Sequence, residues 1–256
     1  MTQQKLDTYL DLCTQVYDLS KPKPPEDAYA FYRSYLMEAK GPVLEPMCGT
    51  GRFFLPLLEE GFDVCGFDAS DHMLRALHAK ANFRNLKPNV WQGFVENLEK
   101  PERYNLIFIP GGSFGLILDL NRARAALRTF YEHLNEEGIL VFEAETLKSA
   151  PSQAGIWRAS AWHREDGKMI IANFLDLPLA DNVSPTICKY ELIDDHKIVH
   201  TEIEDFKVRH YAPENLIGMI KSVGFKEVRM IKAFDRSAAP SGNDDVVVYE
   251  CLKTFK

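Results

Sequence analysis

The pattern of apolar and polar positions changes along the chain. From residue 42 to residue 145, short apolar runs typical of buried strands alternate with stretches whose apolar residues recur at helical spacing. The expected strands are 42–47, 63–68, 89–95, 104–110 and 138–145, and the expected helices are 52–60, 71–82 and 121–134. This alternation predicts an α/β fold: a Rossmann-like doubly wound sheet, mostly parallel, with helices on both faces. Such a sheet binds ligands at the carboxyl ends of its strands.

Two amphipathic helices are expected before this region. Apolar residues recur at helical spacing over 6–19 and again over 26–38, with a proline-rich break between the two stretches. We expect residues 1–40 to form an N-terminal helical lid over a core that spans residues 41–149.

Residues 150–211 lack helical spacing and read as paired strands. Glu165-Asp166-Gly167 is a hairpin turn, and Asp194-Asp195-His196 is a candidate for a second one. The segment therefore predicts a small antiparallel β insertion of three or four strands, which serves the substrate or a dimer contact. The expected strands are 156–163, 168–176, 187–193 and 197–208. We interpret the many acidic residues of the insertion mainly as a solvated surface.

The last segment, 212–256, is expected to complete the core sheet. Pro213 is suited to the first position of a helix, and Gly224 is suited to ending it. Two strand-like runs follow at 226–234 and 245–252, separated by a polar loop. They predict a hairpin that adds an antiparallel C-terminal edge strand to the sheet.

Composition narrows the function classes. The 256 residues include 37 acidic and 30 basic side chains, a formal net charge of −7, which argues against a nucleic-acid partner because that affinity comes largely from Lys and Arg. The five cysteines form no CxxC or Cys/His cluster, so we expect neither a disulfide framework nor a metal site. Without an apolar leader or a run long enough to span a bilayer, the sequence predicts a cytoplasmic protein with no membrane partner.

The chemistry is concentrated in the turn after the first expected strand, Val43-Leu44-Glu45-Pro46-Met47-Cys48-Gly49-Thr50-Gly51-Arg52. Gly49 and Gly51 allow a tight turn and a close approach to a ligand, and the helix that follows begins with unpaired N–H groups. A dinucleotide fingerprint requires a third glycine where Phe54 stands, so an NAD-dependent oxidoreductase is the less favoured interpretation.

Two acidic residues at strand ends point to a different ligand. Glu45, beside the glycine loop, would repel a pyrophosphate but attract an ammonium group. Asp68 ends the second strand, where a carboxylate can accept both hydroxyls of a ribose. Ser70 is then an N-cap candidate for the next helix and brings Met73 near the nucleoside.

These residues resemble the first motifs of the class I S-adenosylmethionine-dependent methyltransferases, in the branch whose first motif reads LEPxCGTGR. The resemblance covers about 43–145. It extends more weakly to the C-terminus, where Tyr211-Ala212-Pro213-Glu214-Asn215-Leu216 and Val223-Gly224-Phe225 resemble a stretch of small-molecule members. The antiparallel insertion resembles that of N-methyltransferases acting on amino acids and amino sugars.

The resemblance also implies roles toward the cofactor, S-adenosyl-L-methionine. Gly49 and Gly51 would surround its methionine part, Glu45 would lie on the amino-group side, and Asp68 would bind the ribose. The resemblance adds Tyr17 as a lid residue, Ala69 and Met73 beside the adenine, and a backbone carbonyl near Pro110. The family usually has an aspartate at the end of the third strand, where this chain has Phe94. We expect the Phe94 ring and the Val95 N–H to contact the adenine instead.

The sequence leaves the catalytic residue open. The candidates are Ser113 after the fourth strand, Glu143 at the end of the fifth, and His210 beside the helix that returns to the core. A base is required only if the acceptor arrives as a protonated amine.

The resemblance implies in-line methyl transfer to a small-molecule acceptor, nitrogen favoured over oxygen, with S-adenosyl-L-homocysteine as the product. The protein's main task would then be alignment and exclusion of water. Because a fold does not imply an activity, the alternative is a catalytically inactive protein that binds this cofactor or another partner. A monomer or a homodimer is expected.

Overall fold

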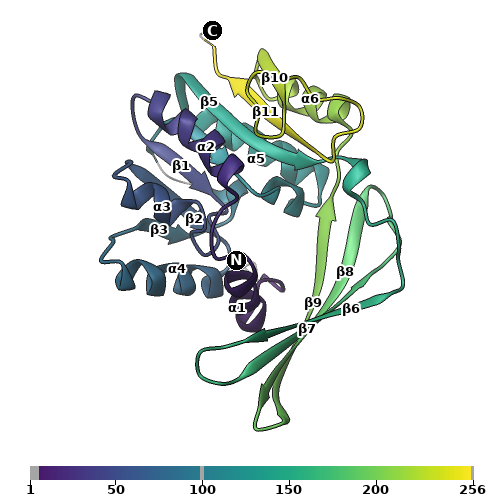
Figure 1. Cartoon of the computed structure of the whole chain (residues 1–256). Coiled ribbons are helices and arrows are strands. Elements are labelled where there is room, and N and C mark those ends of the chain that lie inside the picture. The colour runs from purple at the N-terminus through teal and green to yellow at the C-terminus, as the bar shows by residue number, and fades with distance from the viewer. Residues whose placement is uncertain (1–5, 99–100, 255–256) are drawn as a thin grey trace.

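The computed structural model describes residues 6–98 and 101–254, which form two β-sheets and the helices packed on them (Figure 1). The larger sheet has seven strands in the order β10-β11-β5-β4-β1-β2-β3. Its strands are β1 Val43–Pro46, β2 Val64–Asp68, β3 Asn89–Gln92, β4 Tyr104–Ile109, β5 Leu134–Glu145, β10 Glu227–Lys232 and β11 Val246–Leu252.

The larger sheet is mostly parallel, and the predicted α/β fold class is confirmed. Strands β1 to β5 pair in parallel, whereas β11 pairs antiparallel with β5 on one side and with β10 on the other. The strand order reverses between β1 and β4, which is the point where a doubly wound sheet opens a crevice for a ligand.

Helices cover both faces of this sheet. Helices α2 (Glu26–Glu38), α3 (Phe54–Glu59) and α4 (Asp71–Phe83) pack on one face, and α5 (Leu120–His133) and α6 (Pro213–Ser222) pack on the other. Each of these helices turns an apolar stripe toward the strands, as the helical spacing predicts. The core therefore has three layers (Figure 1).

The smaller sheet contains four antiparallel strands in the order β6-β7-β8-β9. They are β6 Trp157–His163, β7 Met169–Asp176, β8 Val183–Asp194 and β9 Lys197–Arg209. Helix α1 (Asp11–Ser20) packs on one face of this sheet, where Leu12 and Val16 meet Ile170 and Tyr190. The predicted antiparallel insertion is thus present, and the first helix of the chain belongs to its hydrophobic cluster.

Several predicted boundaries were wrong. Helix α1 begins at Asp11 and not near residue 6, because Tyr9 adopts a left-handed backbone conformation, with φ at 56°. Strand β5 begins at Leu134, directly after α5, although the apolar pattern predicts its start at residue 138. Strand β3 ends at Gln92, and a short 3-10 helix follows at Val95–Asn97. At the start of α1, contacts from a strand distant in the sequence accompany the observed boundary.

Candidate functional site

A cavity of about 390 Å³ opens at the carboxyl ends of the parallel strands. Its walls come from the segment before α1, from α1 itself, from the turns after β1, β2, β3 and β4, and from β9 of the smaller sheet. The size suits a nucleoside-sized ligand, since small-molecule sites usually occupy roughly 300–1,000 Å³.

The two loop glycines face different surroundings. Gly49 has φ at 54° and lines the cavity, and a Cβ added there would meet only the Met73 Sδ atom, at 3.9 Å. Gly51 has φ at 80°, and its Cβ would lie 2.8 Å from Leu55 Cγ and 3.0 Å from Leu77 Cγ. Gly49 therefore opens the backbone toward a ligand, whereas Gly51 allows close packing between α3 and α4.

The Asp68 carboxylate is part of the cavity wall. Its Oδ2 atom accepts the Gly49 N–H at 2.8 Å and its Oδ1 atom accepts the Ser70 N–H at 2.8 Å. Burial raises the pKa of this carboxyl, and the backbone hydrogen bonds oppose that shift. A carboxylate has about four acceptor positions, and the Ala69 N–H also interacts with Asp68, so Asp68 keeps the capacity to accept a ligand hydroxyl.

Glu45 is a buried carboxyl beside this wall. Its exposed fraction is 2%, and its Oε2 atom has no hydrogen-bond partner among the described residues. Burial raises its pKa well above the ordinary value, and the negative charge of Asp68 raises it further. Because an isolated buried carboxylate is costly, the site is electrostatically suited to a cationic group.

Most of the residues that the resemblance assigns to the cofactor share this cavity. Its lining includes Tyr17, Gly49, Asp68, Ala69, Met73, Phe94 and Val95. The Ser70 hydroxyl accepts the Met73 N–H at 3.2 Å and so caps α4, as the sequence predicts. Burial raises the pKa of the Tyr17 hydroxyl, while nearby Arg52 lowers it.

The three catalytic candidates lie in different environments. Ser113 lines the cavity, and its hydroxyl donates to the carbonyl of buried Pro110 at 3.0 Å. Glu143 does not belong to the cavity lining: it is buried, and its Oε1 atom accepts the Tyr32 hydroxyl at 3.0 Å and the Gly111 N–H at 2.6 Å. Burial is the main cause of the raised pKa of Glu143.

His210 lies outside the cavity lining and joins the two sheets. Its Nε2 atom is 2.7 Å from the Ser184 hydroxyl on β8, and its Nδ1 atom is 3.1 Å from the Thr146 carbonyl, just after β5. Nδ1 also lies 3.0 Å from the Ser149 hydroxyl. With both ring nitrogens engaged and only 2% of the residue exposed, His210 has the surroundings of a structural histidine.

Part of the cavity wall was not predicted. Asp205, Phe206 and Lys207 of β9 line the cavity, as do Leu6, Thr8 and Tyr9 before α1. The interpretation of the acidic insertion as a solvated surface was also wrong at Glu204, which is only 1% exposed. The sequence did contain one signal for this. Positions 202, 204 and 206 alternate along a strand and therefore lie on the same face, so Glu204 could have been expected to share the face of the apolar Phe206.

Phe54 explains the missing third glycine of the loop. Phe54 is fully buried at the start of α3, and a Cβ added at Gly66 of β2 would lie 3.1 Å from its Cε2 atom. The aromatic ring fills the space that close helix–strand packing in a dinucleotide site would need.

Comparisons with known proteins agree with this geometry. Residues 43–138 match a family described as "Methyltransferase domain". The chain is 24% identical over 244 residues to "Putative methyltransferase YqeM" of Bacillus subtilis, covering 93% of this chain and 95% of that protein. A protein of Geobacillus sp., "Putative methyltransferase GWCH70_2453", is 28% identical over 135 residues, and this chain spans only 55% of its length.

Solved structures show the same fold. A S-adenosylmethionine-dependent methyltransferase from Clostridium acetobutylicum superposes with a TM-score of 0.77 at 16% identity, covering 94% of this chain and 97% of that chain. The sugar N-methyltransferase KedS8 from a Streptoalloteichus species gives a TM-score of 0.75 at 16% identity, with 100% and 99% coverage. Among the described residues, we find no helix long and apolar enough to cross a membrane and no cluster of three or more metal-ligating side chains.

Proposed function

Because residues 43–138 match a methyltransferase domain and the chain shares the fold of an S-adenosylmethionine-dependent methyltransferase, we propose that it transfers a methyl group from S-adenosyl-L-methionine to the amine of a small molecule. The observation that carries the proposal is the pair of acidic residues at the ends of β1 and β2. Asp68 lines the cavity and can accept a ribose hydroxyl. Glu45 is buried outside the cavity lining, close enough for the Asp68 charge to raise its pKa, and its Oε2 atom has no hydrogen-bond partner among the described residues. Together they match a ligand that combines a ribose with an ammonium group.

The residues around the cavity fit the remaining parts of this cofactor. Met73, Phe94 and Val95 supply an apolar wall for the adenine, and the open face of Gly49 accommodates the methionine part. Tyr17 of α1 also lines the cavity, and in this proposal it serves as the lid residue. These assignments rest on the cavity lining together with the resemblance in the sequence.

When bound, the cofactor supplies a methyl group that its positively charged sulfur already activates. The protein then has to hold the acceptor in line with the sulfur–carbon bond and to exclude water. Tyr17 of α1 and Phe206 of β9 line the cavity, and their rings are the groups that we propose to exclude water.

An acceptor that arrives as a protonated amine must lose a proton before its nitrogen attacks. Glu143 is our candidate for the base, because its carboxylate accepts the Gly111 N–H, two residues before the cavity-lining Ser113. Its raised pKa brings the carboxyl closer to neutral pH, which suits a general base. Both hydrogen bonds from Tyr32 and Gly111 are accepted by Oε1, so Oε2 is the atom that would take the proton. The half-exposed Glu145 on the same strand end adds a second negative charge for a cationic acceptor. The likeness to the sugar N-methyltransferase KedS8 supports nitrogen as the acceptor atom.

The test is the formation of S-adenosylhomocysteine with defined acceptors. The purified chain is incubated with S-adenosylmethionine and a panel of primary and secondary amines, with phenols and carboxylic acids as matched sets. We expect turnover with members of the amine set, and we expect Glu143→Gln to lower kcat while the affinity for S-adenosylhomocysteine stays unchanged. Binding of S-adenosylhomocysteine without turnover on any set would favour the inactive, cofactor-binding alternative.

A further inference from the structure

Helix α1 begins without a side-chain cap of its own. Its N-cap residue, Leu10, offers no hydrogen-bonding side chain, although the first N–H groups of a helix need partners. The partners come from β9 of the smaller sheet, almost two hundred residues away in the sequence. Glu204 accepts the N–H groups of Tyr9 at 3.0 Å and Leu10 at 2.8 Å, and Glu202 accepts the Leu12 N–H at 2.7 Å.

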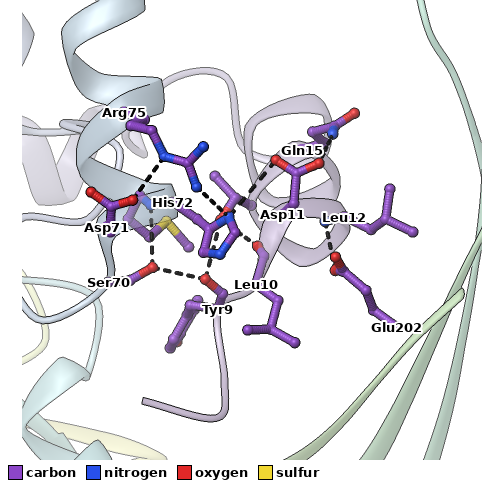
Figure 2. Close-up of polar contacts among 12 residues, drawn as sticks. Tyr9, Leu10, Asp11, Leu12, Gln15, Ser70, Asp71, His72, Arg75 and Glu202 are labelled. Carbon is purple, nitrogen blue, oxygen red and sulfur yellow. Dashed lines mark hydrogen bonds and ion pairs between the residues drawn. The ribbon is translucent and has the colours of Figure 1, made fainter. Parts of the chain in front are cut away.

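The same segment is also tied to the core sheet. The Ser70 hydroxyl donates to the Tyr9 carbonyl at 2.8 Å, as Figure 2 shows, and the Ser70 N–H donates to the Asp68 carboxylate. A second, longer contact links the same two elements: His72 Nδ1 of α4 lies 3.9 Å from Asp11 Oδ1 of α1. Tyr9 thus has its carbonyl bound by the core and its N–H bound by the insertion.

Tyr9 adopts a conformation that needs such support. A φ of 56° is unusual for a bulky residue that is not glycine, and such strain persists only where the surroundings fix it. The Tyr9 ring also packs edge-on against Phe206, with ring centroids 5.8 Å apart. Tyr9, Thr8 and Phe206 all line the cavity, so the strained segment is part of its wall.

We propose that Glu204 is a positioning residue for the cofactor: from the insertion sheet, it holds the Tyr9 segment across the cavity and against the Asp68–Ser70 turn. This proposal rests on the proposed function, because it assumes that S-adenosylmethionine occupies the cavity. It goes further by giving the smaller sheet a role in cofactor affinity. A continuous series of hydrogen bonds leads from Asp68 through Ser70 and Tyr9 to Glu204.

The position of Glu204 sets it apart from other acids of the insertion. Glu202, Glu204 and Phe206 are alternate residues of β9 and lie on the face that contacts the start of the chain. By contrast, the Glu191 carboxylate on β8 contacts Lys189 and Asn173 within the sheet. Glu191 is therefore a matched control: a partly buried carboxylate of the same sheet whose contacts do not involve α1.

The experiment compares the affinity for S-adenosylhomocysteine by isothermal titration calorimetry in Glu204→Gln, Glu202→Gln and Glu191→Gln. We expect Glu204→Gln to weaken binding about tenfold, within the usual range of coupling between sites. We expect a smaller loss in Glu202→Gln and none in Glu191→Gln. If Glu204→Gln fails to fold by circular dichroism, Glu202→Gln carries the same comparison against Glu191→Gln.

A double-mutant cycle with Ser70→Ala separates a positioning role from general destabilisation. Both residues hold the Tyr9 segment, so their effects on affinity should combine to less than their sum. Additive effects, or unchanged affinity in both β9 variants while the wild-type chain binds, would overturn the proposal. If the wild-type chain does not bind S-adenosylhomocysteine at all, it is the proposed function that fails.

Discussion

The two sheets build one cavity by different means. In the seven-stranded sheet, Gly49 and Asp68 lie in turns or at strand ends, and short local motifs determine their positions. In the four-stranded sheet, Phe206 lies within β9 and reaches the cavity only because that sheet packs on α1 and on the core. Local motifs therefore define the part of the cavity that we assign to the cofactor, whereas strand register and tertiary packing define the wall from β9.

The largest expected loss of stability is at Gly51, the loop glycine that allows α3 and α4 to pack closely. Gly51→Ala places a methyl group within 2.8 Å of Leu55 Cγ at a left-handed φ, and we expect a loss of about 2–5 kcal/mol in the free energy of unfolding. The matched change, Gly49→Ala, has open space, so we expect a loss of only about 1–2 kcal/mol together with weaker binding of S-adenosylhomocysteine. Urea unfolding and calorimetry measure both quantities. Equal losses of stability would contradict the different roles of the two glycines.

The next largest loss of stability is expected at His210, which joins the two sheets through hydrogen bonds. His210→Ala removes hydrogen bonds to Ser184 of β8 and to the Thr146 carbonyl after β5, and it leaves a buried gap. We expect a loss of about 2–4 kcal/mol in the free energy of unfolding by urea. Because both ring nitrogens of His210 take part in hydrogen bonds that join the two sheets, the pH dependence of methyl transfer should stay as in the wild-type chain. An intact fold with an altered pH profile would instead identify His210 as a base.

A smaller effect, with a defined sign, is expected at Glu45. Its pKa is raised in the folded chain, so the folded state holds its proton more tightly and stability falls as the pH rises above the ordinary value of about 4.3. Glu45→Gln removes this dependence, and we expect it to be about 1–2 kcal/mol more stable than the wild-type chain at pH 7, with the difference vanishing near pH 4. The same change should weaken binding of S-adenosylmethionine. Urea unfolding between pH 4 and pH 8 measures the stability difference.

Glu38 is a control for Glu45, because its pKa is shifted in the opposite direction. Hydrogen bonding to Arg236 lowers the pKa of Glu38, so Glu38→Gln should give no gain of stability at pH 7. A gain at both positions, or an unchanged cofactor affinity in Glu45→Gln, would argue against a special role for the buried Glu45 charge.

The sequence predicted the core sheet and its local site better than the insertion. The spacing of glycines, acidic residues and a capping serine predicted that Gly49, Asp68 and Met73 lie near one ligand, and all three line the same cavity. The same pattern could not separate Gly49 from Gly51, because the distinction depends on Leu55 and Leu77 packing nearby. It also missed the start of α1, since the cap comes from Glu204 on a strand that is distant in the sequence.

The most direct test is thermal unfolding with S-adenosylhomocysteine or NADH, in the wild-type chain and in Asp68→Ala. At about 100 times its dissociation constant, a ligand adds roughly 2.7 kcal/mol, which corresponds to a rise of about 5–10 °C in Tm for a chain of this size. We predict this rise for the wild-type chain with S-adenosylhomocysteine alone, and its loss in Asp68→Ala but not in the exposed control Asp71→Ala. A rise with NADH alone, or an undiminished rise in Asp68→Ala, would contradict the assignment of this cavity to S-adenosylmethionine.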